Sequence, residues 1–390
     1  MLAYIIRRLV YGLITVLALS VVVFFLIQAG GGSPLDRLRG NPRMAPMIPV
    51  LTEHFGLDKP AIQQYFTWLR NFGTPDWDKV GVDGVSPFVA IGVAIAYTIG
   101  AMVAKVRTAW WRTFRTFSII AVWLLALWFA KGRISFALDW SQSFRGDGSV
   151  WNLVFGAAGA TFRLGLAALV LALLIGIPLG IYQAIRQYSF FDQLGTTFSF
   201  VAFSTPIFII GVGLQLVFAY YLERWTGVKL FFVAGMTSTG YSQLSFWGQM
   251  GDIVRHLALP ALAIALISTA TYSRFQRASM LEVMHSDYLR TAKAKGLPRR
   301  RVIVKHALRN ALIPIVTLVS LDIAAIIGGA IITESIFGWP GIGRLYINAI
   351  NAVDYPVVMA VVMAIGIGIV IMNIVADILY GVLDPRVRYD

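Results

Sequence analysis

Three ionisable side chains fall within or beside long apolar segments, where a charge is costly and by default has a functional partner. Arg163 lies near the outer end of its segment, from which its long side chain can reach the membrane interface. Asp377 lies near the inner end of the last segment, where Arg386 or Arg388 could compensate it. Asp322 lies about halfway along its segment. We expect Asp322 either to face a polar pathway or to make a structural contact between helices, and the sequence favours neither.

Side chains for catalysis, nucleotide binding or metal binding are not arranged in any recognisable pattern. The four histidines lie in separate segments without the spacing of metal ligands, and the chain has no cysteine. It has no G-x-x-x-x-G-K-[ST] pattern for a P-loop and no Ser/His/Asp order that suggests a hydrolase. We therefore predict that the chain is not an enzyme and uses neither a cofactor nor a metal ion.

The polar segment 273–311 is better suited to binding a partner protein. Gly296 stands where a left-handed helix C-cap belongs, and Pro298 stands where a new helix can begin. A basic helical stretch follows over 299–310. The pattern predicts helix, tight turn and helix on the cytoplasmic face. Four apolar residues before the turn recur at helical spacing and predict a single stripe: Leu281, Met284, Tyr288 and Ala292.

Two interpretations of this segment carry equal weight on its pattern alone. It could be an amphipathic surface helix that binds anionic membrane lipid. It could instead be a rigid docking element that presents Tyr288, Arg290, Lys293 and Gly296 to a partner. The Gly-Leu-Pro break favours docking, because a helix adsorbed on lipid gains nothing from a sharp turn.

The elements that position these residues are membrane-spanning helices. Of the 390 residues, 58% are hydrophobic and 13% are charged, with a mean hydropathy of +0.73. A bilayer-spanning helix takes about 20 apolar residues. We therefore predict an all-α polytopic membrane protein with about eight transmembrane helices. The apolar segments are 9–29, 87–104, 116–130, 157–184, 194–222, 256–272, 312–333 and 357–380.

The distribution of charge predicts the orientation of these helices. With both termini in the cytoplasm, the inside segments hold 19 Lys and Arg against 5 Asp and Glu, whereas the outside segments hold 13 against 12. The net charge of +14 thus collects on one face, as the positive-inside rule expects. Basic residues beside lipid are explained by topology, so we predict no nucleic-acid partner. The first apolar segment is longer than a signal-peptide core, and we interpret it as an uncleaved span.

Segment 287–314, DYLRTAKAKGLPRRRVIVKHALRNALIP, resembles the cytoplasmic loop of ATP-binding-cassette importer permeases of the dipeptide/oligopeptide/nickel family. Segments 333–359 (TESIFGWPGIGRLYINAINAVDYPVVM) and 373–389 (NIVADILYGVLDPRVRY) are similar to the last extracytoplasmic turn and the C-terminal end of that family. The opening segment is of the same type. The resemblance covers most of the chain outside about 74–138.

The resemblance implies a permease subunit of the inner membrane that forms half of a pathway for peptides or related solutes. It implies as partners a second homologous permease subunit, two cytoplasmic ATPase subunits and an extracytoplasmic solute-binding protein. It also makes segment 273–311 the coupling loop that enters a cleft of the ATPase. Arg290 and Thr291 stand where the family pattern has Glu and Ala, so its acidic contact is missing here. The coupling residues implied are Asp287, Tyr288, Arg290, Thr291, Ala292, Lys293, Gly296 and Leu297.

Such permeases usually have six spans, so segments 87–104 and 116–130 suggest an inserted hairpin, which preserves the orientation of every later helix. We expect it to be peripheral and to face lipid, with a docking site for an accessory subunit as the alternative. A secondary transporter is a weaker hypothesis, because one deep Asp322 and no repeat do not match that class. A membrane scaffold would leave the docking loop without a purpose. The expected division is an N-terminal helix 1–30, an extracytoplasmic segment 31–86, the inserted hairpin 87–138 and a permease core 139–390.

Overall fold

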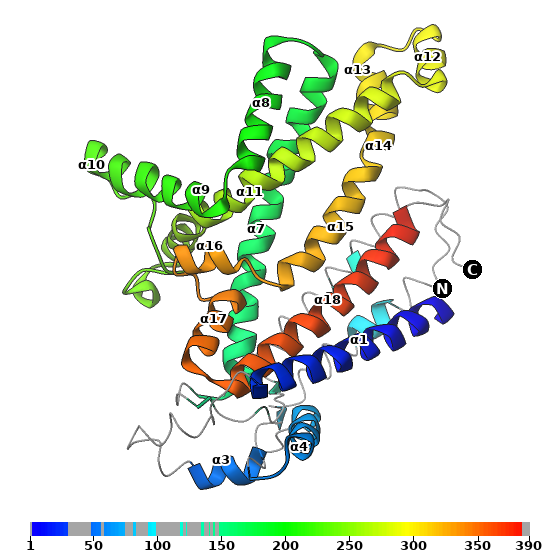
Figure 1. Cartoon of the computed structure of the whole chain (residues 1–390). Helices are drawn as coiled ribbons and strands as arrows, with labels where there is room; N and C mark the ends of the chain where they lie inside the picture. The colour runs from blue at the N-terminus through cyan, green and yellow to red at the C-terminus, as the bar shows by residue number, and fades with distance from the viewer. Residues whose placement is uncertain are drawn as a thin grey trace. The chain divides into compact units, whose positions relative to one another are not determined.

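The computed structural model divides the chain into two compact units. The larger unit comprises Met1–Ala45 and Gln142–Asp390, and the smaller unit comprises Pro46–Ser141. Most of the described residues are helical (Figure 1), so the predicted all-α class is confirmed. The structure describes residues 2–29, 48–55, 58–74, 81–82, 93–98, 118–119, 122, 134–135, 140, 143–144 and 148–383.

Four long helices form the frame of the larger unit. At 28 to 39 residues, each exceeds the roughly 20 residues that a bilayer requires. Pro178 and Pro260 lie inside two of them without ending the helix, as membrane helices tolerate. The four helices are α1 (Leu2–Ala29), α7 (Val150–Ile185), α11 (Phe246–Met284) and α18 (Tyr355–Leu383).

Shorter helices connect this frame. Those between α7 and α11 are α8 (Phe190–Ser204), α9 (Ile207–Leu214), a π-helix (Gln215–Tyr221), α10 (Leu222–Thr226) and a 3₁₀ turn (Tyr241–Gln243). Those between α11 and α18 are α12 (Asp287–Ala294), α13 (Arg299–Arg301), a π-helix (Val302–Ala307), α14 (Leu308–Ala311), α15 (Ile313–Ile327), α16 (Ile331–Ile336) and α17 (Ile342–Ala352).

The packing of α7 against α11 is the most extensive helix contact of the unit. Gly176 and Gly180 lie on the buried face of α7, and a Cβ atom at Gly180 would collide with the backbone of Ser273 and the side chain of Gln276. Small residues four apart allow helix backbones to approach closely in a membrane. The Gly-x-x-x-Gly pattern therefore brings α7 and α11 together. Figure 1 shows α12 and α13 at one end of the unit and α17 toward the other.

Six of the eight predicted spans have counterparts among the described residues. Five helical segments are long and apolar enough to cross a membrane: Arg7–Ala29, Val150–Ile185, Ile207–Thr226, Phe246–Met284 and Tyr355–Val375. The sixth is a pair of helices, Arg299–Ala311 and Ile313–Ile323, with a bend of 44° between them. Most of the predicted spans 87–104 and 116–130 lie outside the described residues, so the count of eight stays a prediction.

Three predicted spans have different bounds in the structure. Segment 312–333 is interrupted, because α15 ends at Ile327 and α16 begins at Ile331. Segment 194–222 is not one helix, because Thr205 is extended before Pro206 and separates α8 from α9. A residue that precedes proline is disfavoured in helical geometry, which explains the break. Segment 256–272 is the middle of α11, which continues to Met284. The first twelve residues of the predicted cytoplasmic loop are therefore the end of a rigid helix.

The smaller unit contains α3 (Ile48–Phe55), α4 (Ala61–Gly73) and two short strands, β1 (Gly81–Val82) and β2 (Ile134–Ser135). The strands are antiparallel, with Gly81 opposite Ser135 and Val82 opposite Ile134. Trp140 stacks on Phe72 at 4.7 Å between ring centroids, and its indole Nε1 donates to the Phe72 carbonyl at 3.1 Å. The chain therefore enters and leaves segment 83–133 at adjacent points.

Candidate coupling and translocation sites

The predicted helix, turn and helix is present after α11. His285 ends α11, α12 follows from Asp287 to Ala294, and Gly296 adopts a left-handed φ of 74°. Pro298 is extended and precedes α13. A left-handed φ is easily adopted by glycine, and proline favours the start of a helix, so both residue types fit their positions. The sequence prediction for this turn is confirmed.

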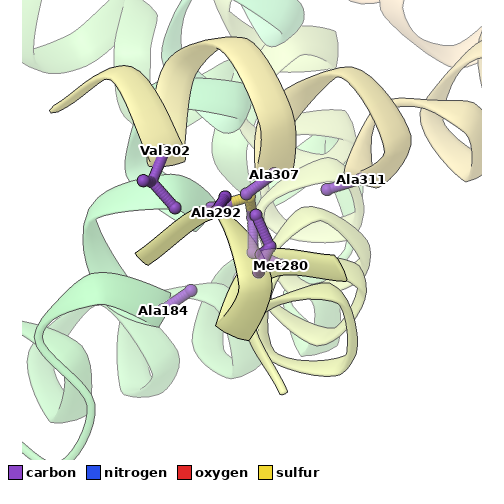
Figure 2. Close-up of a cluster of buried hydrophobic side chains, with 7 residues drawn as sticks. Ala184, Met280, Ala292, Val302, Ala307 and Ala311 are labelled. Carbon is purple, nitrogen blue, oxygen red and sulfur yellow. The ribbon is translucent and has the colours of Figure 1, made fainter. Parts of the chain in front are cut away.

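A cluster of buried side chains fixes α12 to the membrane helices. Leu289 and Ala292 form the inner face of α12, and Leu289 is 1% exposed. Burial of one such aliphatic side chain contributes about 1.5–3 kcal/mol. Leu297, after the turn, packs against the same cluster. Figure 2 shows how the other members converge from α7, α11, the π-helix and α14: Ala184, Met280, Val302, Ala307 and Ala311.

The outer face of α12 carries the polar residues of the predicted coupling site. Asp287, Arg290 and Thr291 are exposed, and the Thr291 hydroxyl donates to the Asp287 carbonyl at 3.0 Å. Arg290 Nη1 lies 3.5 Å from Asp287 Oδ1, with side chains 73% and 95% exposed. Such an exposed pair contributes little to stability and leaves both groups available to a partner. Lys293 belongs to α12, but its side chain lies outside what the structure describes.

The predicted apolar stripe is wrong at Tyr288. Its side chain is 43% exposed, and its hydroxyl accepts a hydrogen bond of 2.8 Å from Asn310 Nδ2. The helix stops at His285 and begins again at Asp287, so the periodicity of α11 does not continue into α12. Leu289 therefore occupies the buried position that the sequence pattern assigned to Tyr288.

An ion pair next to this loop joins α8 to α11. Arg277 Nε and Nη2 donate to the two carboxylate oxygens of Asp192 at 2.7 and 2.9 Å, and Asp192 is 3% exposed. The backbone N–H of Tyr188 also donates to Asp192 at 2.9 Å. The Arg277 guanidinium, and then the Tyr188 N–H, hold the pKa of the Asp192 carboxyl below its usual range, although burial opposes them. The turn between α7 and α8 is thus fixed to α11.

Asp322 lines a cavity of about 210 Å³ between α7, α11, α15 and α16. Its carboxylate accepts a hydrogen bond from the hydroxyl of Tyr272, which is fully buried on α11. Ser268 and Glu334 also line this cavity. Asp322 therefore makes a contact between helices and also borders a cavity whose lining is mostly apolar. The structural contact is present, and a role of Asp322 in a translocation pathway stays a prediction.

Glu334 is a buried carboxylate that the sequence analysis missed, since it falls one residue beyond the predicted span. It is 0% exposed and accepts hydrogen bonds from the Thr161 hydroxyl at 2.7 Å and from the Arg344 N–H at 3.0 Å. A Cβ atom at Gly341 would collide with this carboxylate. Glu334 thus lies at the N-terminus of α17, where a negative charge is favourable. The sequence signal that could have identified Glu334 is its position shortly before Gly341, the residue that precedes α17.

The other intramembrane charges are placed differently. Asp377 pairs with Arg8 on α1, at 3.1 Å between Oδ2 and Nε, and the two arginines suggested by sequence, Arg386 and Arg388, lie outside the described residues. Arg163 is exposed, and its Nη1 lies 3.9 Å from Met236 Sδ in the loop between α10 and α11.

His256, 3% exposed, packs against Asp252 and Phe232. The described residues contain no group of three metal-ligating side chains.

Comparisons with known proteins agree with this arrangement. Residues 176–389 match the family described as binding-protein-dependent transport system inner membrane component, and residues 1–87 match the N-terminal region of such components. The dipeptide transport system permease protein of Escherichia coli K12 is 31% identical, with 100% of this chain and 99% of that protein covered. The di/tripeptide transport system permease protein of Pseudomonas aeruginosa is 32% identical with the same coverage.

A third relative is shorter than this chain. The oligopeptide transport system permease protein of Mycobacterium bovis is 39% identical over 230 residues, which are 59% of this chain and 70% of that protein. The family match, the full-length similarity to known permeases and the apolar helices all indicate the same family. The chain therefore belongs to the family of binding-protein-dependent transport system inner membrane components and is an inner-membrane permease subunit of an ATP-binding-cassette importer, which works with ATPase and solute-binding protein subunits.

Proposed function

We propose that the chain forms half of a translocation pathway for peptides, together with a second homologous permease subunit. Two cytoplasmic ATPase subunits would drive transport, and an extracytoplasmic binding protein would deliver the solute. Full-length similarity to dipeptide and di/tripeptide permeases supports peptides as the solute class. Asp322, beside the cavity between α7 and α15, is our candidate for a side chain of the pathway.

The observation that carries the coupling role is the two-sided character of α12. Its inner face is joined to α7, α11 and α14 by the buried cluster, while its outer face presents Asp287, Tyr288, Arg290 and Thr291. Movement of a docked ATPase would therefore be transmitted to two long membrane helices as a rigid-body shift. Asp192 and Arg277 extend this rigid connection to α8. In this proposal Lys293 and Gly296 complete the docking surface, while Ala292 and Leu297 hold it in place.

A charge reversal on α12 tests this proposal. We expect Arg290→Glu to weaken ATPase retention about tenfold, or 1.4 kcal/mol, because the ATPase of this importer would complement the exposed positive charge of Arg290 in place of the Glu of the family pattern. The measurement is the amount of ATPase that co-purifies with the tagged chain, together with solute-stimulated ATP hydrolysis. Arg224→Glu, on predicted extracytoplasmic α10, is the matched control and should behave like the wild type. Equal ATPase retention by the two variants would contradict docking through α12.

We also propose that residues 87–138 are a hairpin inserted into an otherwise six-span permease, beside an N-terminal helix 1–30, an extracytoplasmic segment 31–86 and a core 139–390. The two family matches leave residues 88–175 between them, and the Mycobacterium relative is several tens of residues shorter than this chain. The pairing of β1 with β2 also supports insertion, since it places both ends of segment 83–133 together.

A further inference from the structure

A cavity of about 520 Å³ lies between α1 and α18. None of its lining residues belongs to the coupling loop or to the proposed translocation pathway. Its walls run along α1 from Arg7 to Leu19 and along α18 from Gly366 to Ile374. Twelve residues of helix correspond to about 18 Å. One leaflet of the hydrocarbon core is about 15 Å deep. The cavity therefore runs from the predicted cytoplasmic headgroup level to near the middle of the bilayer.

The polar groups of this cavity gather at its predicted cytoplasmic end. Arg7 is exposed and forms no ion pair with the residues that the structure describes, whereas the neighbouring Arg8 is paired with Asp377. Tyr11 and Asn373 lie about one turn deeper, on facing helices. Asn373 is an exposed amide within a segment that is otherwise apolar enough to span the membrane. The mouth therefore offers one positive charge that has no ion-pair partner among the described residues, and additional hydrogen-bond donors.

The deeper part of the cavity is apolar. Val16, Leu19, Ile369 and Val370 line it, and Gly12 and Gly366 let the two helices approach closely beside it. A bare apolar wall of this kind would suit either a lipid chain or a helix of a partner protein. Arg7 favours a lipid, because it lies at the predicted headgroup level, where a lipid phosphate would complement its charge while an acyl chain covers the apolar wall below it.

We infer that this cavity binds one anionic phospholipid of the cytoplasmic leaflet. Arg7 would pair with the phosphate, Tyr11 and Asn373 would donate hydrogen bonds to the phosphate or ester oxygens, and one acyl chain would lie between α1 and α18. A single negative headgroup matches Arg7, the one arginine of the cavity lining that has no ion-pair partner among the described residues. The lipid would join α1 to the rest of the permease, since α18 is the helix on which α1 packs most extensively.

Lipid binding can be measured directly by native mass spectrometry of the importer complex. The complex is held in nanodiscs that contain both phosphatidylglycerol and phosphatidylethanolamine. We expect one retained phosphatidylglycerol per permease chain. Arg7→Gln should reduce its retention by about fivefold, as expected for one basic residue at an anionic surface. Thr15→Trp, which fills the cavity without removing a charge, should reduce retention of either lipid. Arg299→Gln, an exposed arginine outside the cavity, is the matched control and should retain the lipid.

Two outcomes would overturn the inference. One is retention of phosphatidylglycerol that Arg7→Gln and Thr15→Trp leave unchanged, or that Arg299→Gln reduces equally. The other is occupancy by protein, which the natural absence of cysteine makes easy to detect. If a single cysteine introduced by Thr15→Cys forms a cross-link to another polytopic subunit in the intact importer, a partner helix rather than a lipid fills the cavity.

Discussion

Gly296 is the single residue on which the shape of the coupling turn depends most directly. Its φ of 74° lies in the left-handed region, and the space where a Cβ atom would stand is open. The cost of a substitution there is therefore conformational and not steric, about 1–2 kcal/mol for an L-residue. We expect Gly296→Val to lower ATP-driven uptake without reducing the amount of chain in the membrane.

Gly296→Asn provides the control, because asparagine adopts the left-handed region more readily than other side chains. It should retain most of the uptake that Gly296→Val loses, with both chains quantified in the same membranes. If valine and asparagine lower uptake equally, the side chain itself obstructs docking and the conformational explanation is wrong.

The Asp192–Arg277 pair predicts a pH dependence of stability. Because the folded-state pKa of Asp192 is lowered, its contribution is fully present above the unfolded value of 3.8 and is lost as the pH falls through the folded pKa. Asp192→Asn should lower stability near pH 7 by about 1.5–3 kcal/mol, the usual worth of a hydrogen bond to a charged group. Thermal unfolding of the purified chain in detergent between pH 7 and pH 3 measures both effects.

The double variant Asp192→Leu with Arg277→Met separates pairing from packing. Replacing both partners by apolar residues leaves no unpaired charge and should cost less than Asp192→Asn alone. The acid-dependent loss of stability below about pH 4 should also diminish in it, since its carboxyl group is gone. An unchanged acid profile in both variants would assign that loss to other carboxyl groups.

At the level of single residues, local rules predicted backbone geometry better than long-range contacts. Gly296 and Pro298 have the conformations that their residue types require. Tyr288 was assigned to the wrong face, because an apolar period cannot reveal that the helix ends at His285 and restarts in another phase. The partner of Glu334, Thr161, is 173 residues away in the chain, and nothing in the local sequence points to it.

At the level of elements, the pairing of β1 with β2 predicts that segment 83–133 can be removed. Val82 and Ile134 are opposite each other in an antiparallel ladder, and an Asn-Gly turn joins such strands well. We expect replacement of 83–133 by Asn-Gly to leave insertion and uptake within about twofold of the wild type, a change of less than 0.5 kcal/mol by the conversion of 1.4 kcal/mol per tenfold. Peptide uptake normalised to membrane-inserted protein measures this.

Removal of segment 87–104 alone is the informative control for that deletion. It removes one predicted span, so every later loop would face the wrong side and uptake should be lost. Full loss of uptake in the 83–133 replacement, with normal insertion, would instead mean that the hairpin takes part in transport or in binding a subunit that transport requires.

Hydropathy located elements well and their ends poorly. It found six segments that correspond to spans in the described part of the chain. It could not show that Pro206 divides α8 from α9, since both sides of the break are equally apolar. Nor could it show that α11 continues twelve residues beyond its apolar part, because its polar end is stabilised by packing with α7 and α8 and not by lipid.

At the level of the whole molecule, composition and charge distribution predict the class and orientation without reference to any single contact. An excess of Lys and Arg on one set of loops, with 58% hydrophobic residues overall, is sufficient for a multi-pass inner-membrane protein. Composition cannot predict the arrangement of subunits or the solute, since these depend on surfaces that other chains complete.

The most direct test of the central claim is uptake of a labelled dipeptide into proteoliposomes that contain the purified importer complex. The proposed coupling predicts uptake that requires both ATP and the solute-binding protein. Arg290→Glu should lower this uptake about tenfold, and Arg224→Glu should leave it unchanged. Dipeptide uptake by the chain without ATPase subunits, driven by an ion gradient and unaffected by Arg290→Glu, would contradict the account.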